Sequence, residues 1–410
     1  MTSGSWKALI GLFVLTMGTS TLTPLLPLYK EHFGISTATA TLLFVTYTVT
    51  VVPTMLIAGN LSDRLGRKRL LLPSLVIMTL ASLVFSFAES VPLLFVGRVL
   101  QGLAIGGFLG VGTAFVVDHA RASSKALAAA MAGVFFRLGF GLGPGLAGIA
   151  AQYGPNPRHF PFQVHMVLML VGIVAVATAA ETLRRSPSPG RFRIRIGVPK
   201  GQALGFLTFV APAIFMMSFI EGTFLSVVPI FVFDTLEVQN LAVLGLIGFL
   251  TLAPGGISPF LVRGLDPRRS MMIGVATSSL LSFGVVASSQ LDSIAVVIAA
   301  VSVIGLTNGF LLYGGTVICA TIVPIEERGK LMSLLYMCAY AGTIPTVGLG
   351  YLADGIGLTA TLTIFSCVAV AIAGFVLTVG RRNFREVIPH DPPLPPPAEL
   401  ATEIVTMEGA

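Results

Sequence analysis

The sequence has little charge. Of its 410 residues, 10% are Asp, Glu, Lys or Arg, 54% are hydrophobic, and the mean hydropathy is +0.90. Typical soluble domains carry about 25% charged residues, so this chain has too little ionic surface for a soluble protein of several domains. The shortage of charge therefore indicates a protein whose solvent is a lipid bilayer.

Residues that carry chemistry are also scarce. The three cysteines, Cys319, Cys338 and Cys367, fall within apolar runs and lack the spacing of a metal site, so we predict neither a disulfide nor a metal. The five histidines do not cluster, and the sequence has no GxxxxGK[ST] phosphate-binding loop and no credible hydrolytic constellation. We therefore expect no enzymatic activity and no cofactor.

The net charge of +7 does not indicate a nucleic-acid partner. The basic residues are scattered through short segments between apolar runs, without interleaved aromatic residues. Most of them fall in alternate segments, which is the bias that places basic loops in the cytoplasm. We expect both termini to be cytoplasmic and the protein to lie in the cell membrane.

Apolar runs of about 20 residues, enough to cross about 30 Å of hydrocarbon, recur along the chain. Backbone groups in lipid must bond internally, so these runs predict helices. The first run follows Lys7 and resembles a secretory signal, but it is long and lacks an obvious cleavage site, so we interpret it as a span. The predicted spans are 8–28, 39–61, 70–88, 92–117, 125–150, 163–182, 203–233, 240–262, 270–288, 294–322, 330–351 and 358–379.

The predicted fold is an all-α membrane protein with twelve transmembrane helices in two six-helix bundles related by pseudo-two-fold symmetry. The two halves repeat each other at an offset of about 200 residues, as in transporters built from duplicated units. Residues 56–69 correspond to 256–269, and Pro144 corresponds to Pro345. The predicted domains are an N-terminal bundle (1–182), a basic cytoplasmic linker (183–202), a C-terminal bundle (203–380) and a disordered, proline-rich cytoplasmic tail (381–410).

Three segments of the first half carry family motifs. Residues 59–69 (GNLSDRLGRKR) match every defining position of the loop signature between helices 2 and 3 of the major facilitator superfamily. Residues 94–102 resemble the superfamily's helix 4 motif, and residues 130–148 match its helix 5 motif in part, with Ala130 and Ala147 in place of glycines. From 8 to 380 the chain resembles the twelve-helix, proton-coupled drug and multidrug antiporters of this superfamily.

The loop signature also has a direct physical reading. Asp63 and Arg67 are spaced i,i+4, and Asp118 ends helix 4 on the same side, so an acid–base–acid relay is expected. The resemblance implies a latch that closes the two halves at the cytoplasmic face. The alternative is a solvated loop that only sets topology. The predicted latch residues are Gly59, Asp63, Arg64, Gly66, Arg67 and Asp118.

The helix 5 motif favours a contact between helices. Its glycines form small-x-x-x-small pairs that let another backbone approach, and its proline frees a carbonyl and bends the helix. We expect a sliding contact between the two halves, and the alternative is ordinary packing of a glycine-rich helix. The motif residues are Gly139, Gly143, Pro144 and Gly148.

Three charged residues lie well inside apolar runs: Arg98, Arg137 and Glu221. Such a charge costs at least about 2.5–3.5 kcal/mol and therefore faces a cavity or a partner. Glu221 can exchange a proton and the arginines cannot, so we predict that these residues couple transport to protons, with Glu221 as the carrier. The alternatives are a permanent ion pair of Glu221 with an arginine, a position of Glu221 nearer the outer interface, and an anchor from Arg98 to backbone carbonyls.

Many proton-driven drug exporters of the superfamily have an acidic residue midway along helix 1, whereas this chain has hydroxyl residues there and Glu31 lies beyond that helix. The departure moves the predicted proton site to helix 7. Polar and aromatic residues elsewhere would line an otherwise apolar cavity. The predicted lining residues are Thr19, Thr23, Tyr47, Gln101, Asn308, Tyr313, Tyr336 and Tyr340.

These features predict a secondary transporter that exports a small amphiphilic organic compound in exchange for protons by alternating access. The expected partners are the substrate, protons and lipid, and we expect a monomer. An importer or uniporter of a polar or anionic metabolite, which Arg98 and Arg137 would bind, is the alternative. A membrane-bound binding or sensor protein on the same fold is a third class.

Overall fold

The computed structural model describes residues 1–182, 197–198, 203–323 and 325–387. Within these ranges the regular elements are helices, and none is a β-strand. Most of the predicted linker 183–202 and of the predicted tail 381–410 lies outside the described residues. The start of that tail, Arg381–Val387, is helical, so the disordered tail was predicted to begin too early. The side chains of Asn60, Asp63, 325–327 and 385–387 also lie outside what is described.

The first half of the chain forms six membrane-length helices. The first consists of α1 (Ser3–Ser20), the 3-10 turn η1 (Thr23–Leu25) and α2 (Leu26–Phe33), because Pro24 and Pro27 lack the amide hydrogen that a continuous helix uses. The other five are α3 (Thr37–Leu65), α4 (Lys68–Ser86), α5 (Val91–Asp118), α6 (Lys125–Tyr153), which follows the 3-10 turn η2 (Ala122–Ser124), and α7 (Phe160–Ala177).

The second half repeats this plan with more interruptions. Its helices are α8 (Ala203–Gly205), the π-turn η3 (Phe206–Val210) and α9 (Ala211–Asp234); α10 (Leu241–Leu252), the 3-10 turn η4 (Ala253–Gly256) and α11 (Ser258–Leu261); α12 (Pro267–Leu281) and α13 (Phe283–Gln290); α14 (Ile294–Thr321); α15 (Ile325–Thr343) and α16 (Thr346–Ile356); and α17 (Leu358–Phe375), the π-turn η5 (Val376–Gly380) and α18 (Arg381–Val387).

The twelve predicted spans agree with these helices, with one correction. Eleven helices of the described residues are long and apolar enough to cross a bilayer, and the twelfth, Leu241–Gly256, is shorter. The predicted continuous span 240–262 is therefore wrong in its last third. Pro254 has no amide hydrogen and is followed by two glycines, so the helix tightens into η4 instead of continuing.

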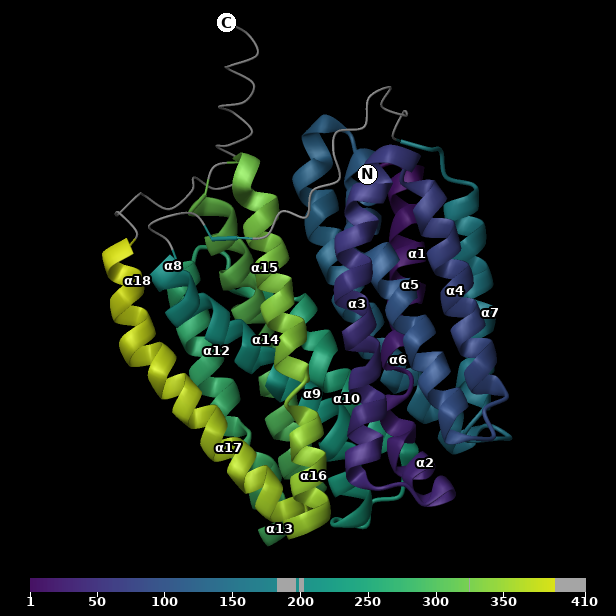
Figure 1. Ribbon diagram of the computed structural model, residues 1–410, viewed down its shortest axis with the longest axis vertical. Coiled ribbons are helices and arrows are strands. Elements are labelled where there is room, and N and C mark those ends of the chain that lie inside the picture. Colours follow the sequence, from purple (N-terminus) through teal and green to yellow (C-terminus); the bar gives the residue numbers. More distant parts are fainter. Residues whose placement is uncertain (183–196, 199–202, 324, 388–410) are drawn as a thin grey trace, which may run out of the picture.

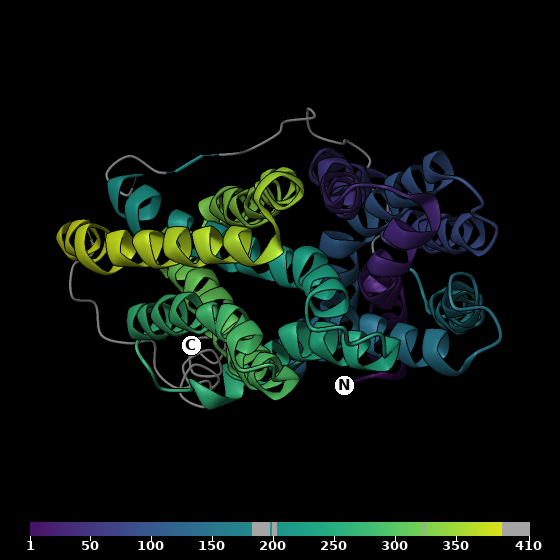
Figure 2. The ribbon, with the colours of Figure 1, turned by 90° about the horizontal axis from the view of Figure 1, so that it is seen from below.

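The helices form two bundles, one from each half of the chain. The bundles lie side by side (Figure 1), and the view along the helices places the two halves on opposite sides (Figure 2). We call the end that carries Ser3 and the turn at Gly66 the N-terminal face, and the end that carries the turns at Gly34 and Gly357 the far face.

The bundles are held together in the half nearer the far face. There α6 packs on α10 and α3 packs on α16, both across the boundary between bundles. The burial of α6 increases towards the far face. Residues 125–130 are exposed except for Ala128, whereas Gly141, Ala147 and Gly148 are buried. The structure is therefore closed at the far face.

Candidate functional site

A buried ion pair joins the bundles at mid-height. Arg137 of α6 donates from Nη1 to Oε1 of Glu221 on α9, at 2.6 Å. The side chains of Arg137 and Glu221 are 7% and 14% exposed, so both charged groups are largely shielded from solvent. Nη2 of Arg137 also lies 3.8 Å from the sulfur of Met217, one turn before Glu221. The sequence left a permanent pair between Glu221 and an arginine open, and the structure identifies Arg137 as the partner.

The break in the eighth span lies against this arginine. A methyl group added to Gly255 would lie 3.5 Å from Cζ of Arg137, and one added to Gly256 would lie 3.4 Å from Cβ of Arg137. Gly255 also contacts α14, where the same added methyl would lie 3.0 Å from the carbonyl oxygen of Gly305. Gly255 thus lets α14 approach this stretch of backbone closely, and Arg137 lies in van der Waals contact with the same stretch.

Three of the predicted lining tyrosines lie in the neighbourhood of the pair. Tyr336 of α15 lies within electrostatic range of Arg137, and Tyr47 of α3 lies within electrostatic range of Glu221. Tyr340, one turn after Tyr336, lies within electrostatic range of the hydroxyl groups of Tyr47 and Tyr336. The structure therefore places Tyr47 near the carboxylate and Tyr336 near the guanidinium, with Tyr340 close to both tyrosines.

Arg98 has a different environment. Its guanidinium donates to the backbone oxygens of Leu43, Thr19 and Phe44 at 2.9–3.0 Å, and to Oε1 of Gln101 at 2.9 Å. The side chain is fully buried, and Cζ lies 4.8 Å from the ring centroid of Tyr47. These contacts tie α5 to α1 and α3 within the first bundle, which is the geometry of the carbonyl anchor that the sequence left open.

The remaining predicted lining residues do not share one environment. Gln101 is buried and donates from Nε2 to the carbonyl oxygen of Gly18 at 2.8 Å. Asn308 is buried inside the second bundle and accepts from Oγ of Ser278 at 2.9 Å. Tyr313 is half-buried. Thr19 and Thr23 lie one turn apart in the first span, and among the described residues their buried hydroxyls have no hydrogen-bond partner.

The glycines of the helix 5 motif contact both bundles. Gly139 and Gly143 pack against the backbone of α1, within the first bundle, at the carbonyls of Phe13 and Met17. Gly148 meets the second bundle, where a methyl group on it would lie 2.8 Å from Cα of Gly245 in α10. The contact between halves at this motif is therefore made by Gly148 together with Pro144, and not by the Gly139 and Gly143 pair.

Pro144 lies between these two faces and bends α6. Because proline has no amide hydrogen, it cannot bond the carbonyl of Phe140, four residues earlier. Oγ of Ser20 in α1 donates to that carbonyl instead. The carbonyl oxygen of Pro144 itself faces α10, where a methyl group on Gly245 would lie 2.5 Å away.

The structure describes most, but not all, side chains of the loop signature (59–69). Nε of Arg67 donates to Oδ2 of Asp118 at 3.2 Å, and Nη1 of Arg67 donates to Oγ of Ser62 at 2.9 Å. Gly66 has a φ of 101°, in the region that favours glycine. A methyl group on Gly59 would meet open space. The side chain of Asp63 lies outside the described residues, and Arg64 is half-buried at the end of α3.

Glu181 completes this cluster and was not predicted. Its carboxylate accepts from the backbone amides of Arg67 and Lys68 at 3.1 and 3.0 Å, at the positive end of α4. Nζ of Lys68 in turn donates to the carbonyl oxygen of Ala179 at 3.0 Å. From the sequence alone, Glu181 is a lone acid at the end of the predicted span 163–182, and only its place beside a basic region could have drawn attention to it.

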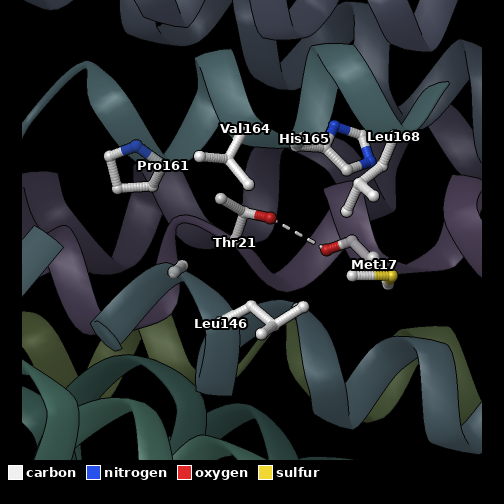
Figure 3. Close-up of a pocket in the computed structure, with 9 residues that line it drawn as sticks. Met17, Thr21, Leu146, Pro161, Val164, His165 and Leu168 are labelled. Atoms are coloured by element: carbon white, nitrogen blue, oxygen red, sulfur yellow. Dashed lines mark hydrogen bonds between the residues drawn. The ribbon is translucent and has the colours of Figure 1, made fainter. Parts of the chain in front are cut away.

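Two cavities contain none of the predicted lining residues. One, with about 10 Å³, lies between α1, α6 and α7 and could hold about one water molecule. In Figure 3, Met17 of α1 and Thr21, the residue after α1, are joined by a hydrogen bond and lie between Leu146 of α6 and His165 of α7. The other is an apolar groove of about 590 Å³ between α9, α15 and α17.

Twelve helices in two bundles, joined at mid-height by a buried ion pair, define a polytopic membrane protein built in the manner of a secondary transporter. A sequence model of the Major Facilitator Superfamily matches residues 8–347. The chain belongs to this superfamily, whose members are transporters.

Individual relatives are distant. The chain is 32% identical to the Bacillibactin exporter of Bacillus subtilis over 123 residues, which cover 29% of this chain and 31% of that protein. It is 26% identical to Multidrug resistance protein 1 of Bacillus subtilis over 208 residues, or 51% of each chain. The matches thus cover about a third to a half of these relatives.

Solved structures support the fold. The peptide transporter POT in complex with sulfate has a TM-score of 0.77 at 15% identity, with 94% of this chain and 96% of that chain covered. The nucleoside transporter NupG has a TM-score of 0.67 at 13% identity, with 93% and 100% covered. These likenesses concern the fold alone.

Proposed function

We propose that this protein exports a small amphiphilic organic compound in exchange for protons, by alternating access between its two bundles. The observation that carries the proposal is the ion pair between Arg137 and Glu221, because it is buried at mid-height and each bundle contributes one partner. Glu221 is the proposed proton carrier, and the names of two relatives, an exporter and a multidrug resistance protein, favour outward transport of an organic compound.

The pair offers a route from protonation to movement. An ionised Glu221 holds Arg137 and thereby holds the bundles together at their centre. Once Glu221 is protonated, the guanidinium loses its counter-charge, and a buried unpaired charge is costly. A conformation in which the bundles separate around Arg137 and water reaches it is then favoured. One proton moving inward through 100 mV supplies about 2.3 kcal/mol for this cycle.

The rest of the molecule has supporting roles in this proposal. The tyrosines Tyr47, Tyr336 and Tyr340 would offer an amphiphilic compound aromatic faces beside a carboxylate. Arg98, with its carbonyl partners, would hold the first bundle rigid. Arg67 and Asp118 would take part in the latch at the N-terminal face, which we propose is cytoplasmic in a plasma-membrane protein whose two bundles are the domains 1–182 and 203–380.

The test uses purified protein in a weakly buffered detergent solution, to which ethidium is added as an amphiphilic probe. An exchanger should release protons when the dye binds, and Glu221→Gln should abolish this release while keeping the size of the side chain. In liposomes, dye accumulation driven by a pH gradient should also vanish. Counterflow of dye without a gradient should persist.

Glu31→Gln is the matched control, because Glu31 is an exposed carboxylate at the far face. It should release protons as the unmodified protein does. Intact gradient-driven flux in Glu221→Gln would refute the carrier role. Lost flux together with a large fall in thermal stability would instead indicate a structural pair, because removing one partner of a buried pair costs about 3–5 kcal/mol.

An importer or uniporter of an anionic metabolite is the second candidate. The observation that favours it is the guanidinium of Arg137, which a carboxylate or phosphate of a substrate could bind in place of Glu221. This function predicts no proton release on binding of any compound, and uptake that does not depend on a pH gradient.

A further inference from the structure

The far face carries a contact that no sequence motif indicated. Asp354, near the end of α16 in the second bundle, accepts from the backbone amides of Thr37 and Ala38 at 2.8 and 2.9 Å. These amides form the first turn of α3 in the first bundle, so each carboxylate oxygen of Asp354 binds one free amide at the positive end of that helix. The contact is therefore a charge-assisted bond between bundles.

The backbones beneath Asp354 approach closely. One turn earlier in α16, a methyl group on Gly350 would lie 2.7 Å from Cα of Ala38 and 3.0 Å from the carbonyl oxygen of Thr37. The glycine thus lets α16 lie directly against α3, which brings the carboxylate of Asp354 within hydrogen-bond distance of the amides. The seal combines backbone packing with two charge-assisted hydrogen bonds.

Two further contacts close the same face. Nζ of Lys30 in α2 lies 2.7 Å from Oδ2 of Asp234 at the end of α9. Oε1 of Gln152 near the end of α6 accepts from the backbone amide of Leu241, the first residue of α10, at 2.8 Å. Each of these contacts joins one bundle to the other, so Asp354 is one of three polar contacts distributed around the boundary.

We propose that Asp354 is the gate residue of the far face: its bonds to the first turn of α3 hold that face closed, and their rupture is required to open it. This inference rests on the proposed alternating access. Among the three contacts Asp354 has the most weight, because it makes two bonds to amides that the helix itself cannot satisfy, whereas each of the other two contacts is a single bond.

The experiment measures the far-face separation directly. Spin labels are placed at Glu31 and Gln239, exposed residues on the two sides of the boundary, after the three cysteines have been replaced by alanine. The distance between the labels is measured in liposomes by double electron–electron resonance, without substrate. Asp354→Asn keeps the shape of the side chain but removes the charge and one acceptor. We expect the ratio of far-face-open to far-face-closed molecules to rise about tenfold, which corresponds to about 1.4 kcal/mol.

Asp292→Asn is the control, since Asp292 is exposed in the loop before α14 on the same face, and it should leave the distance distribution unchanged. Gly350→Leu perturbs the same seal by steric means and should also increase the open population. Unchanged distances in both Asp354→Asn and Gly350→Leu would refute the gate, as would an equal change in Asp292→Asn. Because these readings need no proton gradient and no substrate, the gate can fail while proton coupling through Glu221 holds, and the reverse.

Discussion

Three glycines of α6 provide a graded test of how the bundles are held. Gly133→Ala, Gly143→Ala and Gly148→Ala each add one methyl group to the same helix. The methyl group meets open space at Gly133, the carbonyl of Met17 in the same bundle at Gly143, and Cα of Gly245 in the other bundle at Gly148. The three substitutions therefore separate helix propensity, packing within a bundle and packing between bundles.

The expected magnitudes follow from these neighbours. Gly133→Ala should be neutral or stabilising by up to about 1 kcal/mol, because alanine favours a helix. At Gly143 the methyl group would overlap the backbone carbonyl of Met17 and lie 3.0 Å from its carbonyl carbon, so the backbones of α1 and α6 must shift. Such overpacking costs typically about 1–3 kcal/mol and should lower the thermal stability.

At Gly148 the clash can be relieved by separating the bundles. We expect Gly148→Ala to leave thermal stability near that of the unmodified protein while the far face opens, with a shift of about 1–3 kcal/mol, or roughly 5- to 150-fold in the population ratio. Thermal unfolding of the purified variants measures the first quantity, and spin labels at Glu31 and Gln239 measure the second. If Gly143→Ala and Gly148→Ala give the same pair of readings, the division of α6 into an inner face and a boundary face is wrong.

Two other substitutions test the remaining proposals. Asp63→Asn removes one charge from the loop signature without changing its shape, so the variant should accumulate in the membrane at the normal level and transport slowly; transport at the unmodified rate would exclude the latch. Arg98→Met removes a guanidinium that donates to three backbone carbonyls, at about 1.5–3 kcal/mol for each bond to a charged group, so thermal unfolding of the purified variant should show a loss of at least about 3 kcal/mol. If Arg98→Met has normal thermal stability but has lost proton coupling, Arg98 takes part in proton coupling and is not a structural anchor.

Most of the fold could be predicted from the sequence, because length and hydropathy determine a membrane span almost without regard to its neighbours. The eighth span departs from its prediction because a hydropathy average over 240–262 does not register that Pro254, Gly255 and Gly256 interrupt the hydrogen bonding of the helix.

The candidate site could be predicted from the sequence only in part. The cost of a charge in lipid singles out Arg137 and Glu221, but 84 residues separate them, and helical periodicity cannot show that they meet. Asp354 and Glu181 were missed because their partners are backbone amides at the starts of other helices, and such amides have no signature in the sequence. Side-chain identity alone therefore locates the charges but not their partners.

The bend at Pro144 has a mechanical consequence. A proline in a membrane helix often serves as a flexible joint, because its unbonded carbonyl lets the helix straighten and bend. Here Oγ of Ser20 in α1 donates to the carbonyl of Phe140, and Gly143 lies against the backbone of α1, so the part of α6 before Pro144 is fastened to its own bundle. Beyond Pro144, Gly148 contacts α10 of the second bundle. We expect the part of α6 before the proline to move with the first bundle as a rigid body, so that any flexing of α6 during the cycle takes place at Pro144.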